Sequence, residues 1–562
     1  MTTDPDGTRG SGPGAQNDGA RGPGLGAQYP GRGDQGRGGK RRRTRLWVGA
    51  ATLLALVASF PLRRASQLAA EPVGEKDCGP EVDPSAATAA PVVDASRLPW
   101  TQRGGTVNDA SCLNRTPVHG VVAVRSDDDV RAALAYARDA GLTVSVAGVR
   151  HSMGGQAFAP GAVLLDMRSF NRIQLDAERR VVTVQSGATW HDIQRQLHPR
   201  FAVQAMQSTD IFSVGGSISV NAHGMDHRSG SVGTSVRSMR VMLPDGTVRT
   251  ASRDADADLF RHVVGGYGLF GVILDAELDV VDNAVYASER RVVDYRAFDD
   301  VFREISGDPA IRLLYGHLST SPGSLLREML LYTYRQVEAP GATLPPLGEV
   351  SQVKLRRLVF NLAKRGPTWM RVKWFAEKYL EPRLESCTVT RNEAMGQGEA
   401  CLVSRNDPMH DSVPYLRNAL PDETDILHEY FIPRSVFVPF VDGLRAVVEQ
   451  EGANLLNASV RVVHREDVAL SYAPGDDMLA VVLYLNQPAT QAGTRAMAQL
   501  TSRLIDLTAD LGGRFFLPYQ LHYTPAQLRR SYPEIDAVFA AKRQIDPDER
   551  LTSTFYERFG RK

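Results

Sequence analysis

A glycine-rich loop with a single histidine is the strongest chemical signal in the sequence. It reads Gly148-Val149-Arg150-His151-Ser152-Met153-Gly154-Gly155-Gln156 and follows a short apolar run, Thr143–Ala147, of strand type. Glycines let the backbone approach a phosphate closely, and consecutive amides can form an anion-binding nest. The spacing differs from GxGxxG, so a Rossmann fingerprint is not supported. The histidine is either an ordinary polar turn residue or a functional one.

The surrounding residues resemble a known flavin-binding loop. Residues 144–167, VSVAGVRHSMGGQAFAPGAVLLDM, are similar to that loop in the vanillyl-alcohol oxidase family, and most similar to cytokinin dehydrogenases. In that family the histidine before the serine bonds covalently to the 8α-methyl carbon of FAD. The resemblance implies that His151, followed by Ser152, holds FAD in this way. Arg150 stands where the family usually has glycine.

Three further segments resemble the same family, in the same order along the chain. Ser186–Trp190 resembles the segment before the second flavin-binding stretch, Val214–Gly224 the GG…HG stretch of aldonolactone and alditol oxidases, and Leu259–Ile273 the LF…GG.G.FGVI stretch. The resemblance implies a PCMH-type FAD-binding domain. The cofactor-binding residues that it implies are Gly148, Val149, Arg150, His151, Ser152, Gln156, Ser213, Gly215, Gly216, Ser219, His223, Gly224, Gly271, Ile273 and Tyr519.

The resemblance also implies catalytic residues. Cytokinin dehydrogenases carry an aspartate base shortly before the GG stretch, where this chain has Asp210; a helix cap or loop carboxylate is the alternative. Tyr519 matches a tyrosine near the flavin of those enzymes. Arg461 resembles the arginine of the alditol oxidases' EIR segment, in which Ser459 replaces the glutamate. His522 stands at the histidine of their HWxK segment, whose lysine is absent here.

These residues predict an FAD-dependent oxidoreductase with no metal site. A substrate bond would be oxidised by hydride transfer to the flavin while a nearby base accepts the proton. Arg461 and the Ala222-His223-Gly224 segment favour a small organic substrate with a CH–OH group, and the loop 148–156 favours amine oxidation. The electron acceptor would be oxygen, a quinone or a redox protein. The alternatives of another class are a catalytically inactive, membrane-tethered binding protein and a nucleic-acid binder.

The N-terminus differs in composition from the rest of the chain. Residues 1–45 hold nine Lys/Arg and four Asp/Glu, and the first 40 residues hold 13 glycines, which predicts a disordered basic tail. A 17-residue apolar run, residues 46–62, follows. Its basic flank predicts a transmembrane signal anchor in the cell membrane, with the catalytic domain extracytoplasmic; a cleaved export signal is the alternative. The net charge of +1 gives no reason to expect a nucleic-acid partner.

Strand and helix patterns define the expected fold class. Val121–Val124, a helix from Ser126 to Gly141, and Thr143–Ala147 form a βαβ pattern. We expect an α+β protein, with a two-subdomain PCMH-type FAD-binding domain and an α+β substrate, or cap, domain. The expected boundaries are 1–45 for the tail, 46–62 for the hydrophobic segment, 63–100 for a linker, 101–285 for the FAD-binding domain, 286–510 for the cap domain, and 511–562 for a C-terminal segment returning to the flavin domain.

Two other patterns lie outside the flavin motifs. The four cysteines, Cys78, Cys112, Cys387 and Cys401, have no metal-type spacing. Two disulfides are possible in an exported domain, and proximity favours Cys78–Cys112 and Cys387–Cys401; four free thiols are the alternative. Residues 354–383 combine nine Lys/Arg with aromatic and apolar residues, which suits an interfacial membrane helix broken at Pro367. A pair of surface helices whose apolar residues face the protein is the alternative.

Overall fold

The structure is a computed structural model of the 562-residue chain. It describes residues 62–70, 78, 98–338, 344, 346–347, 352–380, 401–410 and 419–561. The chain divides into two units, residues 1–63 and 64–562, and every helix and strand bounded below belongs to the second unit. The predicted basic tail, residues 46–61 of the hydrophobic segment, most of the linker and Cys387 lie outside the described residues. Within the described part, no helix is both long and apolar enough to cross a membrane.

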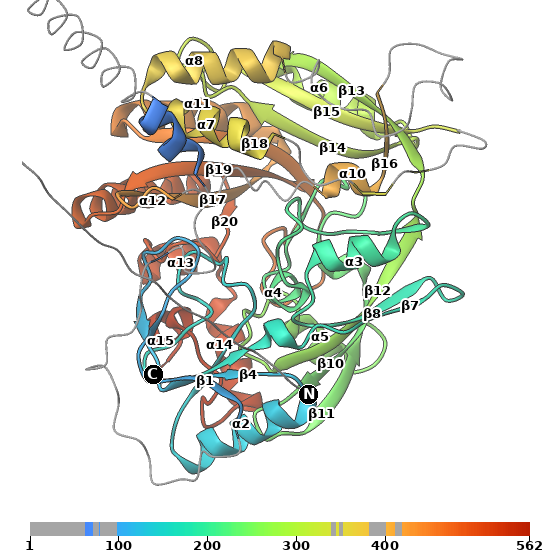
Figure 1. Cartoon of the computed structure of the whole chain (residues 1–562), viewed down its shortest axis with the longest axis vertical. Coiled ribbons are helices and arrows are strands. Elements are labelled where there is room, and N and C mark those ends of the chain that lie inside the picture. Colours follow the sequence, from blue (N-terminus) through green and yellow to red (C-terminus); the bar gives the residue numbers. More distant parts are fainter. Residues whose placement is uncertain are drawn as a thin grey trace, which may run out of the picture. The chain divides into compact units, whose positions relative to one another are not determined.

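The FAD-binding region begins with a four-stranded sheet of order β1-β4-β6-β5 (Figure 1). Its strands are β1 (Trp100–Arg103), β4 (Gly120–Ala123), β6 (Val163–Asp166) and β5 (Val144–Ala147), and the ribbon β2 (Thr106–Val107) and β3 (Thr116–Pro117) lies beside them in sequence. β6 is parallel to β4 and to β5. Helix α2 (Asp127–Asp139) begins at Ser126, which forms a capping box with Asp129. The predicted βαβ pattern is confirmed, with β6 inserted between its two strands.

A six-stranded antiparallel sheet forms the second half of this region. It has the order β11-β10-β12-β8-β7, with β9 paired to β12. The elements are β7 (Ile173–Asp176), β8 (Val181–Gln185), α3 (Trp190–Leu197), β9 (Phe201–Val203), α4 (Val214–Ser219), β10 (Val236–Met242), β11 (Val248–Ser252), α5 (Ala257–Val263) and β12 (Val272–Asp282). Thr189 caps α3 at the predicted helix start. The region ends where β12 leads directly into the next sheet, close to the boundary expected at residue 285.

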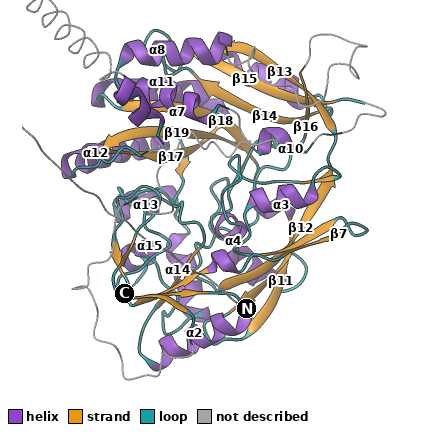
Figure 2. Ribbon diagram, in the orientation of Figure 1, coloured by secondary structure: helices purple, strands orange, loops and turns teal. Residues whose placement is uncertain are grey.

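The cap domain is built on one eight-stranded antiparallel sheet of order β16-β13-β15-β14-β18-β19-β17-β20 (Figure 2). Its strands are β13 (Val285–Asp294), β14 (Ile311–Leu318), β15 (Glu328–Gln336), β16 (Cys401–Ser404), β17 (Glu423–Pro433), β18 (Asn454–Val463), β19 (Met478–Pro488) and β20 (Arg514–Phe515). Its helices are α6 (Phe298–Ser306), α7 (Val353–Ala363), α8 (Pro367–Phe375) with the π-helical turn η5 (Ala376–Leu380), α10 (Asn406–Met409), α11 (Phe437–Glu451) and α12 (Gln491–Asp510).

The two faces of the cap sheet have different neighbours. Ile426 and Tyr430 of β17 share a hydrophobic core with Phe440 of α11 and Leu504 of α12. Because side chains alternate along a strand, Leu427 and Glu429 point to the opposite face. On that face, α7 covers part of the sheet through Phe360, which packs with residues of β18 and β19. The rest of that face lines the cavity described below.

The C-terminal segment returns from the cap sheet to the FAD-binding region, as its family resemblance implies. Helices α13 (Pro525–Ser531), α14 (Ile535–Ile545) and α15 (Thr554–Phe559) follow β20. Leu551 forms a parallel bridge with Val144 of β5. The hydroxyl of Thr554 donates to the carbonyl of Gly155 at 2.7 Å, in the glycine-rich loop. Residues far apart in the sequence are thereby joined at the flavin loop.

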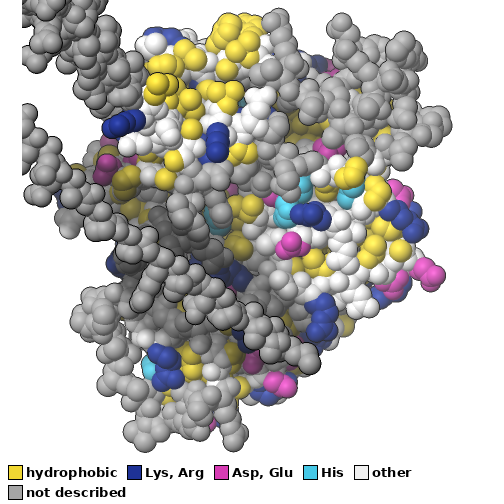
Figure 3. Space-filling model, viewed as in Figure 1, with side chains coloured by type: hydrophobic (Ala, Val, Ile, Leu, Met, Phe, Trp, Pro, Cys, Tyr) yellow, Lys and Arg dark blue, Asp and Glu magenta, His cyan; other side chains and the backbone are white. Residues whose placement is uncertain are grey.

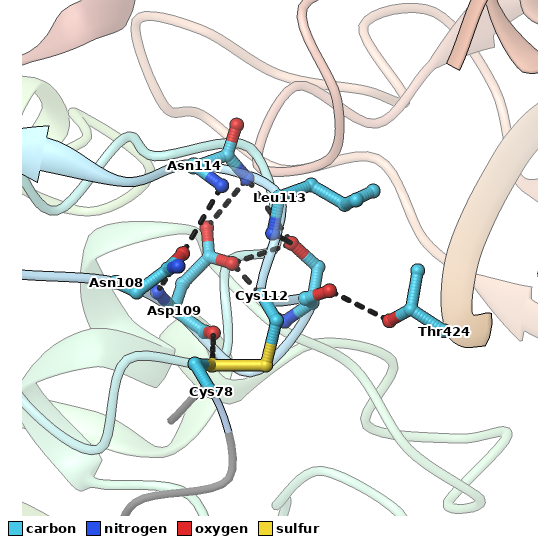
Figure 4. Close-up of a disulfide and its surroundings, with 8 residues drawn as sticks. Cys78, Asn108, Asp109, Cys112, Leu113, Asn114 and Thr424 are labelled. Atoms are coloured by element: carbon cyan, nitrogen blue, oxygen red, sulfur yellow. Dashed lines mark hydrogen bonds between the residues drawn. A yellow bond between two sulfur atoms is a disulfide. The ribbon is translucent and has the colours of Figure 1, made fainter. Parts of the chain in front are cut away.

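The predicted Cys78–Cys112 disulfide is present (Figure 4). Beside it, the carbonyl of Ser111 accepts a hydrogen bond of 2.6 Å from the Thr424 hydroxyl, at the start of β17. The buried carboxylate of Asp109 accepts hydrogen bonds from Ser111 and, at 2.9 Å, from the backbone amide of Gly155. The disulfide turn therefore braces the glycine-rich loop against the cap sheet. The predicted Cys387–Cys401 pair lies outside the described residues.

Part of the segment expected to be a linker, residues 63–100, is helical. Residues 64–69 are helical and Leu68 is buried. The side-chain amide of Asn361 in α7 donates to the carbonyl of Leu68 at 2.7 Å, and Arg357 donates to the carbonyl of Ala69 at 3.1 Å. Tertiary contacts with α7 stabilise this segment, whose low hydrophobicity gave no sign of a core contact.

Candidate functional site

A cavity of about 1030 Å³ is lined by both the FAD-binding region and the cap domain. This volume is at the upper end of ligand sites, which span roughly 300–1,000 Å³. Most of the predicted site residues line it, namely Gly148, Val149, Arg150, His151, Ser152, Gln156, Ser213, Gly215, Gly216, Ser219, His223, Gly271, Ile273, Arg461 and Tyr519. Three do not line it, namely Asp210, Gly224 and His522. The sequence motifs therefore converge on one cavity from five separate segments.

The glycine-rich loop forms one wall of this cavity and is tightly packed. A Cβ atom on Gly148 would lie 1.9 Å from the Ser213 hydroxyl, so glycine is required where these two loops touch. Arg150 has φ = 61°, in the left-handed region that glycine adopts without strain and other residues adopt at a cost of roughly 1–2 kcal/mol. The arginine forms an ion pair of 3.2 Å with Asp166 at the end of β6. This ion pair holds the Arg150 side chain against β6.

His151 is half-buried in this wall. Its ring packs edge-on against the ring of Phe212, with 5.1 Å between centroids and an interplanar angle of 76°. Both residues line the cavity. An edge-to-face contact of this kind orients the imidazole, which is what a histidine with a covalent role requires.

Gln156 connects the loop to the C-terminal segment. Its side-chain amide donates to the carbonyls of Leu517 at 2.7 Å and Tyr519 at 2.6 Å. The phenol of Tyr519 lies in the same cavity as His151. Gln156 thus positions a catalytic candidate rather than only a cofactor.

The opposite wall comes from alternate residues of the cap strands. Leu427 and Glu429 of β17, Ser459 and Arg461 of β18, and Tyr315 of β14 all line the cavity. Each is on the sheet face that points away from α11 and α12, since side chains alternate along a strand. This wall combines apolar and aromatic side chains with polar and charged groups, which can fix the orientation of a small molecule.

Four polar side chains meet on this wall. Glu429 is 4% exposed, and one of its carboxylate oxygens is in short contact with Nε2 of His223. The Tyr519 hydroxyl donates to the other oxygen at 3.4 Å. Burial raises the pKa of Tyr519 well above its usual value, and the Glu429 carboxylate raises it further, against the effect of Arg461. Burial lowers the pKa of Arg461, and Glu429 opposes that shift. The four groups form one electrostatic unit.

Glu429 is the functional candidate that the sequence analysis missed. Four residues without charge, Tyr430–Pro433, follow it in β17. A carboxylate beside such a buried run indicates a functional residue, because acidic side chains are rarely buried without a partner. Across the sheet, Glu429 and Ser459 pair with Val482 from the two sides of β19. The chain therefore supplies a carboxylate in the same row as the position where Ser459 replaces the EIR glutamate.

Asp210 does not take the predicted place at the cavity. Its side chain is fully buried, with Oδ2 2.8 Å from Nδ1 of His191 and 3.0 Å from Nδ1 of His410. These three groups are close enough to hold a metal ion. The two imidazole rings are stacked, with 4.8 Å between centroids, which favours a hydrogen-bonded cluster that joins α3 to the segment after α10. Asp210 is therefore not among the residues that line the cavity, although its partner His410 is, and its role as a base stays a prediction.

His522 and Gly224 also lie outside the cavity lining, so their predicted roles stay predictions. Burial and, to a lesser extent, Arg558 lower the pKa of His522 to about 4, so its ring is neutral at physiological pH. It lies in the turn before α13. Gly224 packs against backbone, because a Cβ atom there would lie 1.9 Å from the carbonyl of Met206. Loop packing alone therefore requires glycine at this position.

Buried histidines make stability depend on pH. Burial lowers the pKa of His227, His317 and His522 to about 4, and that of His428 to about 3. In the unfolded chain the pKa is about 6.5, so the unfolded state binds more protons below that value. The stabilisation is complete above pH 6.5 and is lost as the pH falls toward 4. We expect the free energy of unfolding from urea titrations to decrease between pH 7.5 and 5.5. The slope should be smaller for His428→Gln, whereas an unchanged slope in that variant would contradict the assignment.

Comparisons with known proteins agree with the motifs. Residues 118–252 match the family model of the FAD binding domain. The chain is 34% identical over 174 residues to an uncharacterized oxidoreductase from the fasciation locus of Rhodococcoides fascians, covering 30% of this chain and 38% of that protein. It is 35% identical over 168 residues to decaprenylphosphoryl-beta-D-ribose oxidase of Mycolicibacterium smegmatis, covering 28% and 36%. It is 31% identical over 170 residues to cytokinin dehydrogenase 2 of Arabidopsis thaliana, covering 29% and 34%. The matches span little more than a third of these relatives.

The residues of the cavity fit FAD. The matched segment identifies an FAD-binding domain, and the glycine-rich loop that lines the cavity belongs to it. The hydroxyls of Ser152, Ser186 and Ser208 line the cavity and are buried with no hydrogen-bond partner among the described residues. Buried hydroxyls normally have partners, so these three are available to a polar ligand such as a phosphate or a ribityl chain.

Proposed function

We propose that this chain is an FAD-dependent oxidoreductase that oxidises a CH–OH group of a small organic substrate and holds its flavin covalently through His151. One observation carries the proposal. A single cavity has the flavin-loop residues on one wall and the Glu429, His223, Tyr519 and Arg461 unit on the other. A substrate between these walls would contact both the cofactor and a proton-accepting carboxylate.

The residues of the second wall divide the work. FAD, when bound, supplies the acceptor for a hydride from the substrate carbon. Glu429 is placed to accept the hydroxyl proton, directly or through Tyr519, whose raised pKa keeps it protonated and able to donate a hydrogen bond. The Arg461 guanidinium, with its Nε unpartnered among the described atoms, can donate to the substrate oxygen. His223 holds the Glu429 carboxylate in place.

The position of Asp210 supports one of the two substrate classes. The amine alternative, which is similar to cytokinin dehydrogenases, assigns the base to the aspartate before the GG stretch, and Asp210 lies outside the cavity lining. The arginine of the CH–OH alternative, Arg461, lines the cavity. One relative is named as an oxidase of a decaprenylphosphoryl ribose, a sugar derivative rich in CH–OH groups. These points support a hydroxylated substrate.

The experiment is anaerobic mixing of the purified yellow protein with alditols, aldonolactones, simple alcohols and cytokinin-like amines. Loss of the visible flavin absorbance with a hydroxylated compound is the expected result. Reduction by the amines alone would replace this proposal with the amine alternative. If dithionite reduces the flavin but no compound of either class reduces it, the result would favour an inactive binding protein. The acceptor is then found by reoxidising the reduced protein with oxygen, a quinone analogue or a redox protein.

We place the protein at the cell membrane, with its catalytic unit outside the cytoplasm. The support is the apolar run of residues 46–62 with five basic residues in the six positions before it and Arg63 and Arg64 after it. Protease added to intact cells should degrade the catalytic unit. Full protection of that unit in a cell without an outer membrane would contradict this location.

A further inference from the structure

Large apolar side chains that are exposed to solvent gather on one short stretch of the described chain. The described part has nine such residues, and six of them belong to α7, α8 and η5. These six are Leu355, Trp369, Val372, Phe375, Tyr379 and Leu380, and we call them the α7–α8 face. Leu355 and Phe375 are each 54% exposed. Figure 3 shows hydrophobic side chains gathered over α8 and α7. Soluble proteins rarely expose apolar groups in such a cluster without a binding role.

The exposed residues of α8 are not the side of the helix that packs against the protein, because α8 buries a different side. The other side of α8 is buried. Met370 packs against residues of α7, and Met370 and Trp374 are 6% and 5% exposed. The indole of Trp374 donates to Glu328 of β15 at 3.1 Å, which fixes the rotation of the helix. Trp369, Val372 and Phe375 follow at intervals of three, so they share the opposite side. Helix α8 is therefore apolar on both faces.

The charge around this face is positive. Residues 352–380, which carry this face, contain eight Lys/Arg and one acidic residue, Glu377, and Lys354 and Arg371 are exposed. Three of the eight basic residues, Arg357, Lys364 and Lys373, are buried; Lys364, for example, lies against Asp425. The remaining positive charge surrounds exposed aromatic rings. This combination matches a lipid surface, where rings enter the headgroup layer and cations meet anionic lipid.

The segment before α7 in sequence, residues 64–69, indicates what covers the α7–α8 face. Residues 64–69 lie against α7, through Asn361 and Arg357. The apolar run of the sequence ends at Leu62, six residues before Leu68, whose carbonyl accepts from Asn361. If that run inserts into a membrane, as proposed above, only about 9 Å of helical chain separates its end from this contact, so a lipid surface is the occupant within reach of α7 and α8.

We propose that the α7–α8 face rests in the interfacial layer of an anionic lipid bilayer, as a membrane contact separate from the N-terminal hydrophobic run. Trp369, Phe375 and Tyr379 lie among the lipid headgroups. Arg356 of α7 and Glu377 of η5 also line the large cavity. If the proposed function holds, a substrate or electron acceptor dissolved in the bilayer would enter the cavity beside these helices. The contact itself does not depend on the flavin.

The test uses the full chain with a disabled first anchor. Leu54→Glu and Val57→Glu make the run too polar to insert. This protein should co-sediment with vesicles of phosphatidylcholine and phosphatidylglycerol, less with phosphatidylcholine alone, and less at high salt. Adding Trp369→Ser and Phe375→Ser should weaken partitioning by about tenfold or more, because two aromatic rings no longer enter the interface. The control is Val248→Ser, a change at an exposed valine of β11 in the FAD-binding region, which should bind as before.

A second measurement uses the native chain. The fluorescence of Trp369 is measured as the difference in emission between the native chain and its Trp369→Phe variant. This difference should be much smaller in vesicles of brominated lipid than in vesicles of ordinary lipid, because bromine quenches only a nearby indole. Flavin content, measured alongside, should be equal in all variants, which separates this test from that of the proposed function. The proposal is overturned if the anchor-disabled chain fails to bind anionic vesicles at low salt, if the serine changes leave binding intact, or if Trp369 emission is unaffected by bromine.

Discussion

The His151→Ala protein is expected to lose all flavin from its acid-precipitated pellet while still binding some FAD before acid treatment. The reason is a division of roles in the cavity wall. In the proposed assignment the His151 imidazole forms the bond to the flavin, whereas Gly148, Gly215 and the unpartnered serine hydroxyls remain to hold the rest of the molecule. Non-covalent FAD should then exchange with solvent and be removed by dialysis.

The measurement is absorbance of the pellet and supernatant after acid precipitation. The matched control is His262→Ala, a change at a histidine of α5 that does not line the cavity, which should keep its flavin in the pellet. Flavin that remains in the pellet of the His151→Ala protein would rule out the link. If the His151→Ala protein holds no FAD before acid treatment, its unfolding transition is compared with that of the native protein. A cooperative transition would show that the fold is intact and that only the flavin site has changed.

The flavin loop could be predicted from the sequence because its determinants are local. Gly148 is needed for a close approach, and the strand before the loop and the helix after Ser126 follow from apolar runs and a capping residue. The family resemblance covered the same continuous segment. Local signals of this kind are readable without knowledge of which strands are neighbours.

The proton-accepting side of the site could not be predicted in the same way. Glu429 becomes a candidate only when β17 is placed two strands from β18, since its partners His223 and Tyr519 are 206 and 90 residues away in the chain. Asp210 shows the reverse case. Its position before the GG stretch predicts a base, but its carboxylate contacts His191 and His410, the second of them 200 residues later, and Asp210 does not itself line the cavity. Non-local pairing, not residue type, decides both cases.

The expected result for Glu429→Gln is a protein that binds flavin normally and reduces it very slowly. Glutamine has nearly the same shape and can still meet His223 and Tyr519, but it cannot take a proton. Loss of a positioned general base costs about 10²–10⁴-fold in rate. The rate of flavin reduction under anaerobic conditions should fall by that factor, with the flavin spectrum and the unfolding transition little changed.

The matched variant is Asp210→Asn, which changes a second buried carboxylate to an amide. If Glu429 is the base, the rate of reduction per bound flavin should be retained in Asp210→Asn, because Asp210 does not itself line the cavity and contacts His191 and His410. Its cost should appear in stability instead, at about 1–3 kcal/mol, since the amide is uncharged and its NH2 group would take the buried, unpartnered position of Oδ1. The reverse pattern, a slow Asp210→Asn and an active Glu429→Gln protein, would return the base to Asp210 and reopen the amine alternative. The comparison is informative whichever substrate is found, because it measures the acceptance of a proton and not the recognition of the molecule that gives it up.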